Sequence, residues 1–330
     1  MRRTLTAAHQ RFGLTAPFRI ARGVKTAADV VTVTIRQGAH EGRGEGVPYP
    51  RYGETIDAAL AAIAAIAPLV DRGGSRADLA AAMPAGAARN AIDNALWDLE
   101  ARLAGTSVAE LAGLPAPGPV ASAITIAIDT PGAMAAAAAR AASVPLLKVK
   151  VDRDGAAAQI AAVRAAAPAP RLIVDPNESW TMADVVALQD LLVAHRVDLL
   201  EQPLPAGADG DLAGFASLVP ICADESLHTA ADLDMLVGRY AVVNVKLDKT
   251  GGLTEALALV DAARTRGFGL MVGCMVCSSL GIAPALLIAG QAGFVDLDGP
   301  LWLSADRAGG VLDRDGLLSP PAPGFWGTPA

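Results

Sequence analysis

The sequence predicts an α/β protein, a modified (β/α)7β barrel of the TIM type with an N-terminal α+β capping domain. Two observations predict this fold. From about residue 120 onward, short apolar segments alternate with Ala- and Leu-rich segments, as expected for parallel strands joined by right-handed helical crossovers. Before that point the order changes to a strand followed by helices, which is typical of an α+β unit.

The capping domain is predicted to span residues 1–115. Residues 30–36 (VVTVTIR) alternate between apolar and polar side chains, the pattern of an antiparallel strand. Ala-rich segments near 54–70 and 86–104 are predicted to form helices. The C-terminal tail 305–330 is rich in Gly and Pro, and we expect it to return to this domain.

Residues 116–304 are predicted to form the barrel, with eight strands and seven intervening helices. The strand candidates are 122–128, 146–151, 171–175, 198–201, 220–224, 241–247, 268–273 and 294–297. The helical candidates are 131–142, 154–166, 181–194, 211–217, 229–237, 253–266 and 278–290. No helix is predicted after the last strand.

Charged residues end six of the eight predicted strands. Active sites of such barrels lie at the C-terminal ends of the strands, so these side chains are expected to share one mouth. They are Lys148 and Lys150 in PLLKVKVD, Asp175 in VDPNESW, Glu201 in LLEQPLP, Asp224 in ADES, Lys246 in NVKLDKTGG, and Asp296 and Asp298 in VDLDGP. A single strand-end Asp is usually a cap or a turn residue, but six concordant ends indicate an active site.

Three of these residues indicate a metal site. Asp175, Glu201 and Asp224 end neighbouring strands and should converge. Three adjacent carboxylates repel one another and would not all stay ionised without a cation. Oxygen-only ligands suit a hard divalent ion, and Mg²⁺ commonly keeps positions open for water or substrate. The sequence therefore predicts one Mg²⁺.

The lysines indicate proton transfer. Lys148 and Lys150 alternate with apolar residues and share one face of their strand. The second and sixth strands are four apart in a ring of eight, so Lys150 and Lys246 should face each other across the mouth, whereas Asp296 and Asp298 should lie opposite the metal. A lysine buried near a divalent ion and a second lysine is expected to have a lowered pKa and to act as a general base.

Two bases on opposite sides of one carbon would invert a stereocentre: one removes a proton and the other returns it to the opposite face. The metal would stabilise the enediolate formed beside a carboxylate. Lys148 could stabilise negative charge on the substrate instead of acting as a base. The alternative is that the lysines only neutralise the acidic strand ends.

Composition excludes other classes. The net charge of −7 argues against a general nucleic-acid binder, and no apolar run reaches the roughly 18 residues of a membrane span. Arg2 and Arg3 precede no apolar stretch, so no signal peptide is predicted and the protein is expected in the cytoplasm. Cys222, Cys274 and Cys277 are expected to be free thiols, and the sequence does not exclude a homo-oligomer.

The motifs together resemble the enolase superfamily, in its muconate-lactonising subgroup. The resemblance rests on K-x-K at 148–150, DPN at 175–177, EQP at 201–203, ADES at 223–226 and NVKLDKTGG at 244–252. Within the subgroup the chain looks most like the dipeptide epimerases, through PYPRYGET at 48–55, RNAIDNALWDLEARLAG at 89–105 and the Asp-x-Asp at 296–298. Lys or His bases working with Mg²⁺ are the known chemistry of this superfamily.

The resemblance implies a role for each candidate residue. Asp175, Glu201 and Asp224 would bind the Mg²⁺ that holds the C-terminal carboxylate of a dipeptide. Lys150 and Lys246 would be the acid/base pair, with Lys148 stabilising the enolate. Further substrate contacts implied by the family are Asp296 and Asp298 for the free α-ammonium, Thr125, and the loop Cys274-Met275-Val276.

The resemblance also suggests a substrate. In PFRIARGVK (17–25), Arg22 is expected to contact a side-chain carboxylate, which predicts L-Ala-D/L-Glu from cell-wall peptide. The alternatives are an N-acylamino acid racemase, an o-succinylbenzoate synthase, or an epimerase of non-acidic dipeptides. A Schiff-base aldolase and a catalytically silent binding protein are disfavoured by the three-carboxylate cluster and by the lysines on both flanks.

Overall fold

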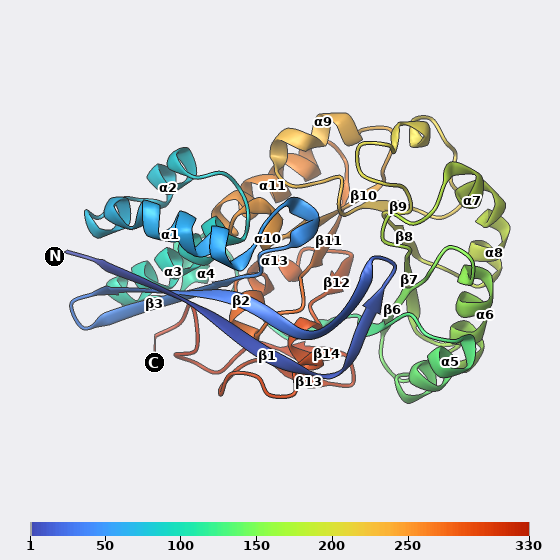
Figure 1. Cartoon of the computed structure of the whole chain (residues 1–330), viewed down its shortest axis with the longest axis horizontal. Helices are drawn as coiled ribbons and strands as arrows, with labels where there is room; N and C mark the ends of the chain where they lie inside the picture. Colours follow the sequence, from blue (N-terminus) through green and yellow to red (C-terminus); the bar gives the residue numbers. More distant parts are fainter. Residues whose placement is uncertain (1, 330) are drawn as a thin grey trace.

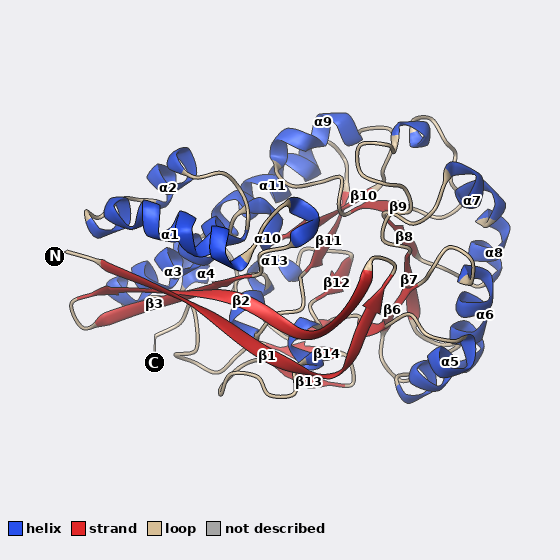
Figure 2. Cartoon of the chain, in the orientation of Figure 1, coloured by secondary structure: helices blue, strands red, loops and turns tan. Residues whose placement is uncertain are grey.

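The computed structural model describes residues 2–329 and contains a barrel with a second unit packed beside it (Figure 1). The helices lie around the outside of the barrel strands, as Figure 2 shows for α5 to α9. Within residues 2–329, no helix combines the length and the apolar character needed to cross a membrane.

The N-terminal unit contains a three-stranded antiparallel sheet of β1 (Thr4–Ile20), β2 (Gly23–Gln37) and β3 (His40–Gly46). Four helices follow: α1 (Ile56–Asp71), α2 (Arg76–Ala82), α3 (Ala87–Ala104) and α4 (Val108–Leu111). Thr55, Ser75 and Ser107 cap α1, α2 and α4 because each side chain accepts a hydrogen bond from a backbone N–H of the first turn. Figure 1 shows the long β1–β2 hairpin running from this unit to the barrel.

The barrel strands follow the predicted order in a single parallel sheet, β5 to β12. Their bounds are β5 (Ile124–Ile126), β6 (Leu146–Lys150), β7 (Arg171–Asp175), β8 (Leu199–Glu201), β9 (Ile221–Ala223), β10 (Val242–Lys246), β11 (Gly269–Gly273) and β12 (Phe294–Asp296). The Ala123 N–H donates to Val295 O at 2.8 Å and so links the first strand's segment to the last. The predicted fold class is confirmed.

The helices between these strands are α5 (Pro131–Arg140), α6 (Ala156–Ala166), α7 (Met182–Ala187), α8 (Gln189–Ala194), α9 (Leu233–Leu236), α10 (Leu247–Thr250), α11 (Leu253–Thr265), α12 (Ser279–Ile282) and α13 (Leu286–Ala289). The helix predicted over 211–217 is wrong: only the 3₁₀ turn η2 (Gly210–Leu212) forms, and Gly214 has a φ of +75°. The helix predicted over 278–290 is divided into α12 and α13, because Pro284 cannot continue a helix.

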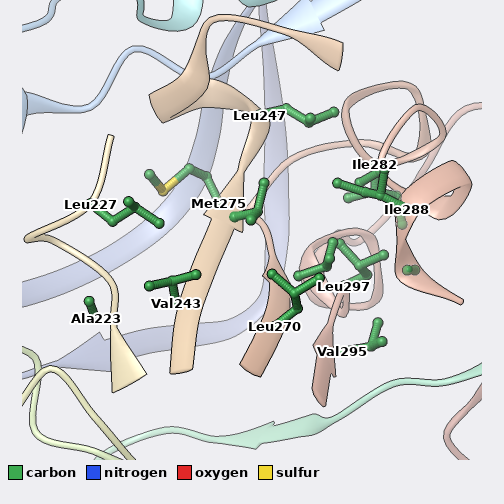
Figure 3. Packing of buried hydrophobic residues seen from close by; sticks show 14 of the residues in the cluster. Ala223, Leu227, Val243, Leu247, Leu270, Met275, Ile282, Ile288, Val295 and Leu297 are labelled. Atoms are coloured by element: carbon green, nitrogen blue, oxygen red, sulfur yellow. The ribbon is translucent and has the colours of Figure 1, made fainter. Parts of the chain in front are cut away.

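Two hydrophobic layers fix the direction of the barrel side chains. The interior layer takes one residue from each of seven strand segments: Ala123, Leu146, Ile173, Leu199, Cys222, Val242 and Met271. The outer layer packs alternate strand residues against the helices, and Figure 3 shows part of it, including Val243, Leu270 and Val295. Because side chains alternate along a strand, residues two and four positions after the interior layer also point inside.

The tail contacts both units. β13 (Leu312–Arg314) and β14 (Leu317–Ser319) form a small sheet with β4 (Val120–Ala121). Beyond it, the Trp326 Nε1–H lies 3.0 Å from Arg43 O and 3.2 Å from Asn94 O in the N-terminal unit. The domain limits 1–115 and 116–304 stay predictions.

Candidate active site

The charged strand ends point into the barrel because of the strand period. Lys148 and Lys150 stand two and four residues after interior Leu146, while Leu147, Val149 and Val151 pack outward. In the same way, the three carboxylates each stand two residues after an interior side chain, in the order Asp175, Glu201 and Asp224 on or beside β7, β8 and β9. These three carboxylates are almost completely buried.

Two of these carboxylates, Asp175 and Glu201, lie with Asp296 around the ammonium group of Lys148. Its Nζ lies 2.7 Å from Glu201 Oε2, 2.7 Å from Asp296 Oδ2 and 3.1 Å from Asp175 Oδ2. Glu201 Oε2 is close enough for an ion pair, yet it accepts no hydrogen bond of acceptable geometry. Lys148 is thus the central cation of an acidic cluster.

The nearby lysines stabilise the three carboxylates unequally, and Glu201 is stabilised least. Burial raises the pKa of Glu201 and Asp175 raises it further, to about 7. Burial acts the same way on Asp175, but Lys150 and Lys148 outweigh it and lower the pKa to about 2. For Asp224, Lys246 and Lys249 outweigh burial and hold the pKa well below its ordinary value. One of the three carboxylates is therefore only partly ionised near neutral pH.

The donor set fits a divalent cation. Within residues 2–329, no three Asp, Glu, His or Cys side chains gather closely enough to ligate one ion together. Even so, the cluster offers three buried carboxylates, one of them with an oxygen that accepts no hydrogen bond. Hard oxygen ligands of this kind suit Mg²⁺. A divalent ion would supply the positive charge that Glu201 needs to ionise.

Each candidate base is paired with a carboxylate. Lys150 Nζ donates to Asp175 Oδ2 at 2.5 Å, and Lys246 Nζ donates to Asp224 Oδ2 at 2.7 Å. β6 and β10 are separated by three strands in the sheet order, so the two lysines come from opposite sides of the barrel, as predicted. A Cβ at Gly273 would lie 3.0 Å from Lys246 Cε, so the glycine leaves room for the lysine chain.

The predicted lowering of the lysine pKa values assumes a bound divalent ion, and the protein's own carboxylates act on Lys148 and Lys246 in the opposite direction. Burial lowers the pKa of Lys148, but Asp296, Glu201 and Asp175 outweigh it and raise the pKa well above its ordinary value. The pKa of Lys246 is likewise raised, since Asp224 outweighs burial. The physical reason is that each ammonium group faces carboxylates, whereas the sequence argument weighed burial and neighbouring cations alone.

Asp296 and Asp298 enter the mouth from β12 and the residues after it. Asp296 Oδ2 accepts from Lys148 Nζ at 2.7 Å, and Asp296 Oδ1 has no hydrogen-bond partner. Asp298 Oδ2 accepts from the Thr125 N–H at 2.8 Å and from the Trp302 indole N–H at 3.3 Å. Burial, followed by the neighbouring Asp296, raises the pKa of Asp298 to about 6.

Arg22 lies at the tip of the β1–β2 hairpin and pairs with the barrel. Its Nη1 donates to Asn177 O and to Glu178 Oε2, both at 2.9 Å. Its Nη2 donates to Glu225 Oε1 at 2.6 Å and to Tyr49 Oη at 3.3 Å. Burial lowers the pKa of Arg22, but Glu225 outweighs this and raises it. Both ends of the guanidinium group therefore already have carboxylate partners.

Lys25 is a pocket cation that sequence reasoning missed. It follows Arg22 on the same hairpin, and its Nζ lies 4.7 Å from the centre of the Tyr49 ring. Burial lowers its pKa. Among the described residues, no carboxylate lies within ion-pair distance of Lys25. The residue was within the motif PFRIARGVK, but only the hairpin's path over the barrel places it in the site.

One pocket collects the predicted residues. Of the twelve site candidates, only Asp175 and Glu201 do not line it, because they lie beneath its floor. Its wall contains Cys274, Met275 and Val276 after β11, as the family comparison implied. The lining residues that sequence reasoning did not name as site candidates are Phe18, Ile20, Lys25, Tyr49, Tyr52, Asn177, Glu225 and Gly299.

Backbone strain lies beside the acidic cluster. Asn177, Glu178 and Gln202 have positive φ values of 45°, 69° and 37°, directly after β7 and β8. Such strain in non-glycine residues is concentrated at functional sites. The side chain of Gln202 contacts a neighbouring strand: its Oε1 accepts from the Asp224 N–H at 2.8 Å and so holds the backbone of Asp224 in place. The motifs DPN and EQP were the available signals for these positions.

Two family models match the chain. Residues 2–113 match the mandelate racemase / muconate lactonizing enzyme N-terminal domain, and residues 133–325 match the enolase C-terminal domain-like family.

Two curated relatives are similar over nearly the whole chain. The L-Ala-D/L-Glu epimerase of Escherichia coli is 48% identical over 306 residues, which cover 92% of this chain and 95% of that protein. The N-acetyl-D-glutamate racemase of Pseudoalteromonas sp. is 46% identical over 302 residues, 90% of this chain and 95% of that protein.

Solved structures agree with the fold. An enolase family member from Agrobacterium tumefaciens, described as homologous to dipeptide epimerases and bound to sodium and L-Ala-L-Glu, has a TM-score of 0.96 at 49% identity and covers 98% of this chain and 100% of its own. A dipeptide epimerase from Enterococcus faecalis, complexed with Mg and L-Leu-L-Tyr, has a TM-score of 0.90 at 30% identity and covers 98% of each chain.

Proposed function

The chain belongs to the enolase superfamily, in its mandelate racemase and muconate-lactonising branch, and from this premise we propose that it epimerises L-Ala-D/L-Glu at the α-carbon of the C-terminal residue. The enzyme is an isomerase acting on dipeptides, with Mg²⁺ as its cofactor. Cell-wall peptide is the proposed source of the dipeptide. The cytoplasm as the place of reaction and a homo-oligomer as the assembly stay predictions.

One observation carries the proposal: Lys150 and Lys246 approach the same pocket from opposite sides of the barrel. In the proposed reaction, one lysine removes the α-proton and the other delivers a proton to the opposite face. Lys148, between the carboxylates and the pocket, stabilises the negative charge that develops on the substrate. Each lysine serves as base in one direction and as acid in the other.

Asp175, Glu201 and Asp224 would hold the Mg²⁺. When bound, the ion supplies positive charge that stabilises the substrate carboxylate as the α-proton leaves. The carboxylates of the chain also orient the bases, since Asp175 pairs with Lys150 and Asp224 pairs with Lys246.

The amine end of the dipeptide would bind at Asp296 and Asp298. Asp296 keeps one oxygen without a partner, and Asp298 is held in place by the Thr125 N–H. Both residues line the pocket, as does Thr125. Cys274 and Val276, from the loop after β11, would contact the body of the substrate.

The side-chain carboxylate of Glu would bind near the β1–β2 hairpin. Arg22 contributes positive charge there, although its guanidinium group is already paired with Glu178 and Glu225. Lys25 has no such partner among the described residues and lines the same pocket. We therefore assign the direct contact to Lys25 and the support of the hairpin to Arg22.

A second function is favoured by a specific observation. The relative from Pseudoalteromonas, at 46% identity, is an N-acetyl-D-glutamate racemase, so an N-acylated acidic amino acid is the alternative substrate. Both substrates carry the glutamate side chain. They differ in the group on the glutamate nitrogen, which is alanyl with a free ammonium group in the dipeptide and uncharged acetyl in the other. The acidic pair Asp296/Asp298 supports the substrate with the free ammonium group, because an uncharged acetyl group cannot form an ion pair with these carboxylates.

The test is a screen in D₂O with Mg²⁺, reading deuterium at the α-carbon. L-Ala-L-Glu should exchange and invert fastest, ahead of L-Ala-L-Leu and N-acetyl-L-Glu. Lys25→Met should lower kcat/KM for L-Ala-L-Glu by about 10- to 100-fold and leave L-Ala-L-Leu nearly unchanged. Arg22→Ala is the matched variant and should affect both dipeptides. A wild type that prefers N-acetyl-L-Glu would replace the proposal with the alternative.

A further inference from the structure

Helix α3 of the N-terminal unit turns a buried polar face toward the barrel. Arg89, Asn90, Asp93 and Asn94 lie on this face, spaced as neighbours over two turns of the helix, and all four are buried. We call these four side chains the α3 polar face. They contact residues 248–254, the segment that directly follows Lys246.

The contacts begin two residues after the lysine, at Asp248. Asn90 Nδ2 donates to Asp248 Oδ1 at 2.7 Å, and the Val47 N–H donates to the same oxygen at 2.8 Å. Arg89 donates from Nη2 to Thr250 O at 2.6 Å and from Nε to Gly251 O at 3.2 Å. The short helix α10 is therefore held at both its side chains and its carbonyl groups.

The contacts continue into the start of α11. Asp93 accepts from the Thr254 N–H at 3.0 Å and from its hydroxyl at 2.6 Å, and Asn94 Oδ1 accepts from the Leu253 N–H at 3.3 Å. Between α10 and α11, a Cβ at Gly252 would lie 2.4 Å from Asp93 Oδ2. Gly252 also has a φ of +118°, so both space and conformation require glycine here.

The segment after Lys246 constrains the position of the Lys246 backbone. Lys246 is both the last residue of β10 and the N-cap residue of α10, so the placement of residues 247–251 constrains its backbone from the C-terminal side. The opposite base is not held in this way. Among the described residues, no hydrogen bond joins α3 to β6 or to residues 151–155 after Lys150; Val151 is instead bonded to Asp175 O.

The polar character of the contact points to positioning. Burying charged groups such as Arg89 and Asp93 contributes little more to stability than an apolar contact of similar size would. Directional hydrogen bonds, in contrast, define one relative placement of the two units. A displacement of about 1 Å at a catalytic group can cost about 100-fold in rate.

We propose that the α3 polar face positions Lys246 and not Lys150, so that the N-terminal unit controls proton transfer on one face of the substrate. This inference rests on the proposed two-base function. It makes Arg89, Asn90, Asp93 and Asn94 positioning residues, because none of them lines the pocket.

The test measures α-proton exchange in D₂O separately for L-Ala-L-Glu and L-Ala-D-Glu at saturating Mg²⁺. Lys246→Ala first identifies the epimer whose exchange depends on Lys246. Asn90→Ala and Asp93→Ala should slow the exchange of that same epimer by about 10- to 100-fold and change the other by less than about threefold. Asp93→Asn, which keeps an acceptor for Thr254, should recover part of the loss.

Two controls separate positioning from loss of fold. Arg102→Met removes a bond within α3, to Asp98, and a contact of α3 with Gly324 O in the tail, so it should leave the ratio of the two exchange rates unchanged. Mg²⁺ affinity is also measured by calorimetry for each variant. Lys249 on α10 donates to Asp224 Oδ1 at 2.6 Å, so a displaced α10 would also disturb a proposed Mg²⁺ ligand.

The outcomes distinguish failure of the positioning role from failure of the proposed function. Equal slowing of both epimers, or unchanged rates in folded Asn90→Ala and Asp93→Ala, would overturn the positioning role and leave the epimerase intact. No exchange with any substrate in the wild type would overturn the proposed function and the inference with it.

Discussion

Asn in place of Asp298 separates a dipeptide substrate from an N-acylated one. Asp298 Oδ2 accepts from the Thr125 N–H at 2.8 Å, and an asparagine oxygen can accept the same bond. The variant should therefore keep its local structure while losing the negative charge. Only a substrate with a free ammonium group depends on that charge.

The size of the effect follows from the surroundings. Losing one partner of a buried charge pair costs about 2–5 kcal/mol. The lower half of this range applies here, because Asp296 still offers a negative charge to the substrate ammonium group. Part of that charge is already offset by Lys148 Nζ, which lies 2.7 Å from Asp296 Oδ2. A loss of about 2–3 kcal/mol corresponds to about 30- to 150-fold in kcat/KM for L-Ala-L-Glu. N-acetyl-L-Glu should change by less than about threefold.

The assay compares kcat/KM for the two substrates by NMR detection of α-deuteration, at a pH above 7. With a folded-state pKa of about 6, Asp298 is ionised there and becomes protonated below pH 6. The wild type should therefore lose activity on L-Ala-L-Glu below about pH 6 through a step that Asp298→Asn lacks. Equal losses on both substrates, with no difference between the pH profiles, would refute the assignment of Asp298 to the amine.

Three further predictions follow from the same structure. Glu201→Gln should weaken Mg²⁺ binding sharply because it removes one of three carboxylates, and calorimetry showing unchanged affinity would contradict this. Lys150→Ala and Lys246→Ala should each abolish inversion yet still exchange the α-proton of opposite epimers; a near-normal inversion rate in either variant would exclude two bases. Ile63→Ala, which opens a cavity in the core between α1 and α3, should lower the free energy of unfolding by about 2–5 kcal/mol in urea titration, and a loss below about 1 kcal/mol would show that the core relaxes around it.

The barrel and its charged mouth could be predicted because local patterns specify them. Strand period alone places Lys148 and Lys150 on the interior face, and strand order alone places Lys246 across from them. The long strand β1 was not predicted, because most of its residues are exposed and its extended form comes from pairing with β2.

Contacts between distant segments could not be predicted from local patterns. Arg22 was recognised as a pocket residue, but its pairing with Glu178 and Glu225 joins residues more than 150 positions apart. Lys25 was missed for the same reason, since only the path of the hairpin over the barrel brings it into the pocket. The alternation of apolar and polar residues predicts which face of a strand a side chain lies on. It does not predict which residue of the other unit contacts that side chain.

The return of the tail to the N-terminal unit has a consequence for synthesis on the ribosome. Gly327 N donates to Asp98 Oδ1 at 2.8 Å, and Val108 N donates to Gly327 O at 2.8 Å. Asp98 and Val108 emerge more than 200 residues before Gly327, so the nascent chain must hold Asp98 without this hydrogen bond until Gly327 has been synthesised. Contacts of such sequence separation slow folding. Synthesis of the segment around Gly327 therefore sets when the N-terminal unit can become native, and a chain without this segment leaves the buried Asp98 incompletely bonded.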